Sequence, residues 1–170
     1  MKKIFVCLML FSLAMPVFAK FVIGQVDVQK VLVSVNMGKK IQKKLQKEFK
    51  KKEKELKGKE SNLRKIQEDF EKQRLVMNND AKRKKEVEMQ KKLLKLRELS
   101  MKYQNEMQSM EQKEKMPILK KIKEIIQTVS KKNAVEFTFE TSTTPIVYAK
   151  NVKDLTAEII KEFNKKHPAK

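Results

Sequence analysis

The longest feature of the chain is a run of helix-favouring residues from about 37 to 133, in which apolar residues recur at helical spacing. Between Lys39 and Met116 the run contains no proline and a single glycine, Gly58. Apolar residues three, four and seven positions apart predict a narrow helix-packing seam. In the first half the seam is Met37, Ile41, Leu45, Phe49, Leu56, Leu63, Ile66, Phe70 and Met77. In the second half it is Val87, Leu94, Met101, Met107 and Met110.

One cluster of turn-forming residues, Met77 to Asp80, interrupts this run. Asn and Asp favour turns because their side chains bond the local backbone. We therefore expect a tight turn near 77–80, a second helix from about Ala81, and an antiparallel hairpin arm over 37–117. Forty residues at 1.5 Å each make such an arm ~60 Å long. With one seam per helix, most of the arm surface must lie in water.

The two ends of the chain, 20–36 and 118–170, have ordinary globular composition and are expected to form a small β-containing body. We expect a strand over 21–28, a short helix over 31–35 capped by Asp27, and an amphipathic helix after Pro117. Pro117 is tolerated in a first helical turn, although it could also kink one continuous helix. Alternation predicts a strand over 135–141, paired in a hairpin with 146–149. Asp154 can cap a last helix.

These elements predict an α+β protein, mainly α, with a long arm and a small body. The body has about seventy residues, a size at which a core is marginal by itself. Its strands also have free edges that call for pairing or covering. Oligomerisation through the body would solve both problems.

The first nineteen residues have the pattern of a secretory signal peptide. Lys2 and Lys3 precede an apolar run that is too short to span a membrane, and small residues end at Ala19, after which we expect cleavage. Cys7, the single cysteine of the sequence, lies inside this segment. Export therefore predicts a periplasmic protein without disulfide or thiol chemistry.

Positive charge is concentrated in the middle segment of the chain, most of which is the predicted arm. Residues 37–133 hold 31 basic and 15 acidic side chains, a net of +16 out of the formal +20 of the whole chain. Such an excess implies anionic partners. Export argues against nucleic acid as a physiological partner. An enzyme is not expected, because His167 is the single histidine and no phosphate-cradling glycine-rich loop is present. We predict no catalytic residue, no metal site and no cofactor.

Several segments resemble the Skp (OmpH-like) family of periplasmic chaperones. Val22 to Leu32 resembles the family's opening strand and helix, Gly38-Lys39 its entry into the first arm helix, and Met116 to Leu119 its return into the body. Residues 146–149 and 154–160 resemble the family's closing strand and closing helix. Two departures stand out. Asn133-Ala134 replaces an expected glycine, where Asn can take the left-handed cap, and Lys150 stands where an acidic residue is common.

The resemblance implies a homotrimer, joined through its sheets, with three arms around a central cavity like the tentacles of a jellyfish. It also implies a holdase that uses no nucleotide and binds unfolded outer-membrane β-barrel proteins. A basic cavity would attract acidic clients over a Debye length, ~8 Å at physiological salt. Flexible methionines suit a promiscuous surface, although a stripe at helical spacing more often packs. The candidate client contacts are Met89, Met101, Met107, Met110, Lys82, Arg83, Lys84 and Lys85, with Met89 expected to lie off the seam.

Two other functions fit the same sequence. A structural coiled-coil protein of the envelope would be a rod without affinity for clients, and the turn and the globular closing segment argue against it. A basic binder of anionic lipid or lipopolysaccharide would use the same arm charge, and this function could coexist with chaperoning.

Overall fold

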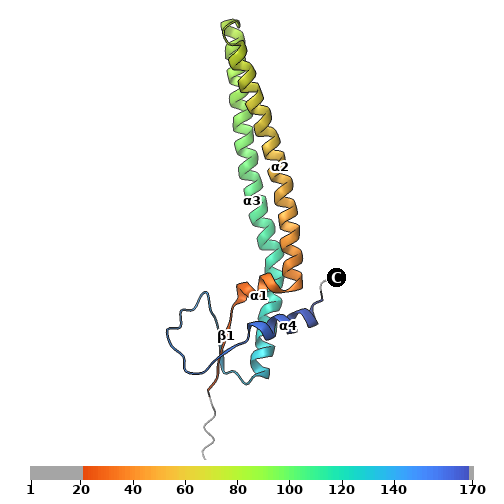
Figure 1. Ribbon diagram of the computed structural model, residues 1–170, viewed down its shortest axis with the longest axis vertical. Helices are drawn as coiled ribbons and strands as arrows, with labels where there is room; N and C mark the ends of the chain where they lie inside the picture. The colour runs from red at the N-terminus through yellow and green to blue at the C-terminus, as the bar shows by residue number, and fades with distance from the viewer. Residues whose placement is uncertain (1–20, 169–170) are drawn as a thin grey trace, which may run out of the picture.

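The computed structural model describes residues 21–168, so the predicted signal peptide, its cleavage site and Cys7 lie outside the described residues. A long two-helix arm rises from a small body (Figure 1). The elements in chain order are β1 (Ile23–Val26), α1 (Val28–Ser34), α2 (Asn36–Gln73), α3 (Asn79–Lys132), β2 (Phe137–Glu140), β3 (Val152–Asp154) and α4 (Thr156–Lys166). The predicted α+β class, mainly α, is confirmed.

The hydrophobic core lies at the base of the arm, where the two ends of the chain meet. One face of α3, from Ile118 to Val129, packs there against α1, β1 and α4. Its buried residues are Val26, Val31, Leu32, Val35, Ile118, Ile122, Ile125, Val129, Leu155, Ile159 and Phe163. The core is thus small for a chain of this length, and no arm residue beyond the base belongs to it.

The helix that returns from the arm does not stop at the body. Pro117 lies inside α3, which runs without interruption from Asn79 to Lys132. The expectation that a separate helix starts at Pro117 is therefore wrong, and the alternative of one continuous helix is right. Proline has no backbone N–H and removes one helical hydrogen bond, but the buried face that begins at Ile118 holds the helix in place. The arm and the core consequently share one rigid element.

The sheet is parallel, which corrects the predicted hairpin. Its strand order is β2-β1-β3, and both outer strands run parallel to β1. The third strand is Val152–Asp154, whereas Ile146–Ala149 forms no strand. The reason is Leu155, which is fully buried in the core and donates its backbone N–H to the Gln25 oxygen at 2.9 Å. This anchor holds the residues immediately before it against β1.

The caps were predicted in part. Asp27 caps α1 as expected, because its Oδ1 accepts from the Lys30 N–H at 2.7 Å. Asp154 accepts from the Thr156 N–H at 2.8 Å at the start of α4, and this bond lowers the pKa of the Asp154 carboxyl. The left-handed residue after α3 is Ala134, with a φ of 50°, and not Asn133. The Val135 N–H bonds the Ser130 oxygen around it, the six-residue closure typical of a helix end.

Two glycines of α2 have opposite surroundings. A Cβ at Gly38 would lie 1.7 Å from the backbone oxygen of Leu32, an impossible separation. Glycine is therefore required where α2 crosses the end of α1. A Cβ at Gly58, by contrast, would have no neighbour within 4 Å.

The same substitution at these two positions should therefore have opposite effects. We expect Gly38→Ala to lower the free energy of unfolding by more than about 2 kcal/mol, because backbone atoms must move apart. Gly58→Ala should raise it by up to about 1 kcal/mol, because alanine is the better helix former. Urea unfolding followed by circular dichroism measures both. Equal effects at the two positions would contradict the close packing at Gly38.

Candidate functional site

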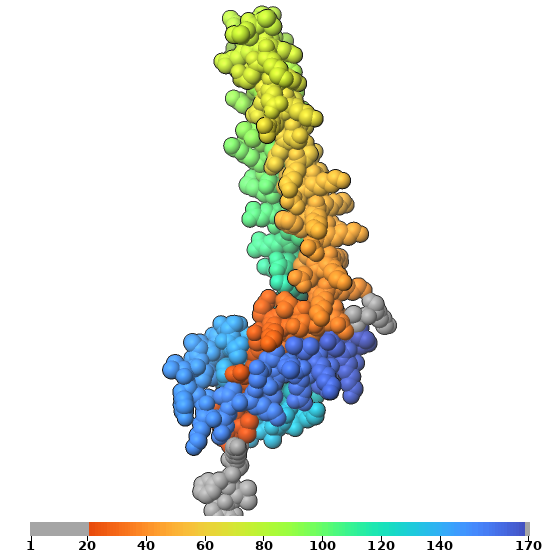
Figure 2. Space-filling view, viewed as in Figure 1, coloured from red at the N-terminus to blue at the C-terminus, as the bar shows by residue number. Residues whose placement is uncertain are grey.

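The arm is an antiparallel pair of helices with little buried surface between them. The 38 residues of α2 span about 57 Å at 1.5 Å per residue. Beyond the base, Leu63 and Phe70 are the buried residues of α2. The predicted seam of α2 is correct except at Phe49, which is exposed. The space-filling view shows a narrow arm from which side chains project along its whole length (Figure 2).

The predicted seam of α3 is wrong at three of its five residues, whereas Met107 and Met110 are half-buried as a seam requires. Val87, Leu94 and Met101 are 42%, 56% and 58% exposed, although apolar residues seven apart usually pack. The face of α3 that lies toward α2 is instead half-buried and consists of Met89, Lys92, Leu96, Leu99, Tyr103, Glu106 and Met110. These residues also recur every three or four positions, so α3 carries two apolar stripes. We call Val87, Leu94 and Met101 the outer stripe.

Polar side chains of α2 and α3 contact each other where few apolar side chains are buried between the two helices. Lys52 of α2 pairs with Glu106 of α3 and also lies 4.0 Å from the centre of the Tyr103 ring. The Tyr103 hydroxyl donates to the Glu55 carboxylate. The Lys52 ammonium lowers the pKa of Glu106, and the bond to Glu55 raises the pKa of Tyr103 to about 12. A cation over an aromatic face adds to such a cluster.

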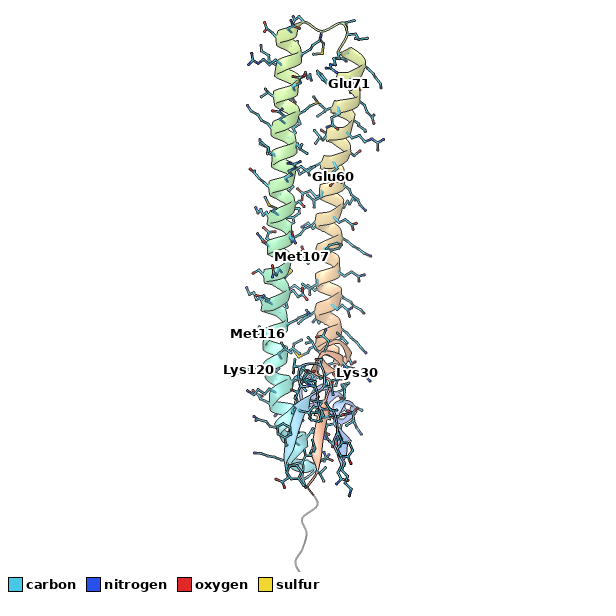
Figure 3. All side chains as sticks on the ribbon, turned by 90° about the vertical axis from the view of Figure 1, so that its left-hand side faces the viewer. Lys30, Glu60, Glu71, Met107, Met116 and Lys120 are labelled. Atoms are coloured by element: carbon cyan, nitrogen blue, oxygen red, sulfur yellow. The ribbon has the colours of Figure 1, made fainter. Side chains whose placement is uncertain are left out.

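An open groove of about 1020 Å³ runs between the arm helices at this level. Its apolar lining comes from Leu45, Phe49 and Leu56 of α2 and from Met107 of α3, with charged side chains at the rim. Figure 3 labels Met107 on α3 and, nearer the body, Met116, which is 63% exposed. The groove shows that the hairpin seam stays partly accessible from outside.

The far end of the arm combines exposed aliphatic and basic residues. The α2 helix ends at Gln73 and α3 begins at Asn79 with Asn78 as its cap, so the turn comes slightly earlier than 77–80. Leu75 and Val76 stand in this turn with 94% and 86% of their surface exposed. The basic residues around them are Lys72, Arg74, Lys82, Arg83, Lys84 and Lys85.

The eight candidate client contacts are not in equivalent places. Met101 is exposed, whereas Met107 lines the interhelical groove and Met110 is half-buried. Met89 is also half-buried on the face toward α2, so the expectation that it lies off the seam is wrong.

The four basic candidates stand together near the start of α3, and all but the half-buried Lys82 are exposed. The sequence pattern missed the exposure of Leu75, Val76 and Leu94, because all three are typical core residues.

Neither a metal site nor a membrane-spanning helix is found among the described residues. Between Phe21 and Pro168, no group of three or more His, Cys, Asp or Glu side chains is placed to hold a metal ion. No helix within the same range is long and apolar enough to cross a membrane. The arm, with its grooves and exposed apolar residues, is therefore the candidate functional surface.

The hydrogen bond between Tyr103 and Glu55 can be tested by titration. In a Tyr148→Phe background Tyr103 is the single remaining tyrosine, and its absorbance should titrate at about 12. The folded pKa lies above the unfolded value of 10.0, so this stabilisation is present below pH 10 and is lost as the pH rises through 12. Glu55→Gln should move the midpoint back toward 10. Glu53→Gln is the matched control, because Glu53 lies two positions before Glu55 and pairs with Lys57. This variant should leave the midpoint of the Tyr103 titration unchanged.

Comparisons with known proteins find a matching family and a similar solved structure. A family model described as outer membrane protein (OmpH-like) matches residues 22–163. A crystal structure of a candidate outer membrane chaperone (OmpH-like) from Caulobacter crescentus CB15 superimposes with a TM-score of 0.70 at 15% sequence identity. The alignment covers 88% of this chain and 86% of that one. No curated protein matches the chain. Since the family model spans most of the sequence, the chain belongs to the OmpH-like outer membrane protein family.

Proposed function

We propose that this protein is a nucleotide-independent, non-enzymatic holdase chaperone of the periplasm, which keeps unfolded outer-membrane β-barrel proteins soluble between its basic arms. The observation that carries the proposal is the arm itself. It is long, strongly basic and incompletely packed, and it exposes apolar side chains that a purely structural rod would cover. The predicted signal peptide supports export. The similar structure from Caulobacter crescentus, described as a candidate chaperone, supports the same function.

Such an arm can hold a client without a fixed binding pocket. Long-range attraction comes from the net charge of +12 over the arm, residues 37–117, and acts over about a Debye length, ~8 Å at physiological salt. Short-range contact comes from scattered apolar residues, which are individually weak. Weak and numerous contacts allow many sequences to bind and to leave again.

A homotrimer is part of this proposal, and the sheet supplies the argument. Phe137 and Val152 stand on either side of Ile23 in the strand register, and they are 52% and 39% exposed. They form an apolar row across one end of the sheet. The loop over 141–151 projects from the side of the body (Figure 1) and exposes almost all of Val147 and Tyr148. Covering this surface would complete the small core and protect the free edges of β2 and β3.

The self-association can be tested at one side chain. The mature chain should have about three times its monomer mass in analytical ultracentrifugation, and Phe137→Asp should reduce this mass because the charge cannot be buried at an apolar interface. Leu75→Asp makes the same kind of change at the arm tip and should leave the mass unaltered. A monomeric wild-type chain would refute the trimer and would leave the client-binding proposal to its own test.

The holdase activity itself is tested with a urea-unfolded outer-membrane β-barrel protein diluted into buffer without nucleotide. The wild-type chain should keep the client soluble at about three chains per client, and less well in high salt because screening weakens charge attraction. Replacing Lys82, Arg83, Lys84 and Lys85 by Gln should weaken this activity several-fold. Replacing Lys150, Lys161, Lys165 and Lys166 of the body by Gln removes the same charge and should have little effect. A client that precipitates as fast with the chain as without it would refute the holdase.

A second candidate, binding of anionic lipid or lipopolysaccharide, is favoured by the arm tip. Leu75 and Val76 are adjacent and almost fully exposed, and basic residues precede them at Arg74 and follow them at 82–85 in the chain. Aliphatic residues that enter a membrane interface next to lysines and arginines bind anionic surfaces, each basic residue contributing about 1 kcal/mol. The same arm charge could serve both functions.

A further inference from the structure

The outer stripe of α3 has the spacing of a packing seam but packs against nothing in the described chain. Val87, Leu94 and Met101 are seven residues apart, which places their side chains about 10.5 Å apart along the helix. All three are exposed, by 42%, 56% and 58%. Nothing within the hairpin accounts for this regular apolar row.

The outer stripe lies on the side of α3 away from α2. Leu96 and Leu99 line a gap between the arm helices together with Gly58 and Leu63 of α2. Leu94 and Met101 each stand two positions from one of these leucines, and two residues turn an α-helix by about 200°. The two stripes of α3 therefore point in nearly opposite directions.

The two helices of the arm consequently present different outer surfaces. On α2 the large apolar side chain that is exposed is Phe49, and it opens into the interhelical groove. Its outward positions, such as Lys54 and Ser61, are polar and exposed. The apolar residues exposed along the length of the arm thus belong mainly to α3.

Charge indicates what can cover the outer stripe. Lys84, Lys91 and Lys102 are exposed beside it, with Glu98 as an acidic neighbour. The basic Arg83, Lys84 and Lys91 and the acidic Asp80 and Glu88 border a shallow hollow around Val87. A second arm, with the same net charge of +12 over residues 37–117, would be repelled there. A polypeptide that carries apolar and acidic residues is complementary to this surface.

We infer that the outer stripe is the client-contacting surface of the arm, so that α3 faces the unfolded polypeptide and α2 faces the solvent. This inference rests on the proposed holdase function and names the surface that performs it. The three apolar side chains, separated by polar ones, each contact an extended client polypeptide, and each contact is weak. Because no deep pocket is required, the contact tolerates many client sequences. Met101 in particular can adapt its shape to different partners.

Site-specific photo-crosslinking tests the orientation of the arm directly. A photoreactive phenylalanine analogue is placed at Leu94, and in a second variant at Ser61, which lies at a similar height on the outer side of α2. Each variant is irradiated with a urea-unfolded outer-membrane β-barrel protein that the wild-type chain keeps soluble. We expect client adducts predominantly from Leu94. Equal adducts from both positions, or more from Ser61, would overturn the inference.

Substitution tests the strength of the contact. The triple variant Val87→Gln, Leu94→Gln, Met101→Gln should bind labelled client at least about tenfold more weakly, since it removes three apolar contacts. Its helix content should persist, because the replaced side chains are exposed. Phe21→Gln with Val33→Gln removes two exposed apolar residues of the body, and this control should change client affinity less than about twofold.

The remaining outcomes distinguish an error in the client-contacting surface from an error in the proposed holdase function. If the wild-type chain holds the client and the triple variant binds it within about twofold of wild type, the outer stripe is not the client surface although the holdase stands. If the triple variant changes the oligomeric mass instead, the stripe is a contact between copies of this chain and the inference is wrong. If the wild-type chain holds no client at all, the proposed function and this inference fail together.

Discussion

One helix connects the arm to the core, and the rest of the architecture depends on that connection. The buried face of α3 from Ile118 to Val129 is the centre of the hydrophobic core, and the same helix continues outward as half of the arm. The other half, α2, begins at Asn36, and its Gly38 packs closely against the Leu32 oxygen. Both arm helices therefore leave the body in fixed directions. Beyond the base they are held together only by short apolar contacts and by polar pairs such as Lys52 with Glu106.

The arm could be predicted from the sequence, but the orientation of its second helix could not. The absence of proline and the helical spacing identified the helices, and the seam of α2 followed because that helix has one apolar stripe. On α3 two stripes satisfy the same periodicity. Leu94 and Leu96 are equally apolar, and only the position of α2 decides that Leu96 packs and Leu94 stays in water. The same ambiguity misplaced Met89 and left the outer stripe unrecognised.

The body shows where local pattern fails for a different reason. Ile146–Ala149 is more apolar than Val152–Asp154, yet the latter forms the strand, because Leu155 is anchored in the core and fixes the residues beside it. Parallel pairing joins segments far apart in sequence, which no local alternation reveals. The positive φ of Ala134 could not be predicted either. The turn that closes α3 imposes this φ, although alanine has no particular preference for the left-handed conformation.

The parallel sheet also has a consequence for the order in which the chain can fold. The two arm helices are neighbours in sequence, so their pairing needs only the closure of a short turn. The strand β1 stands near the start of the chain, but both of its partners follow α3, and the contact that joins Asp27 to Thr156 spans 129 positions. A chain that has emerged as far as Lys132 contains the whole arm and none of the partners of β1. The body can thus be completed only when the last segment arrives, whereas the arm can pair before it.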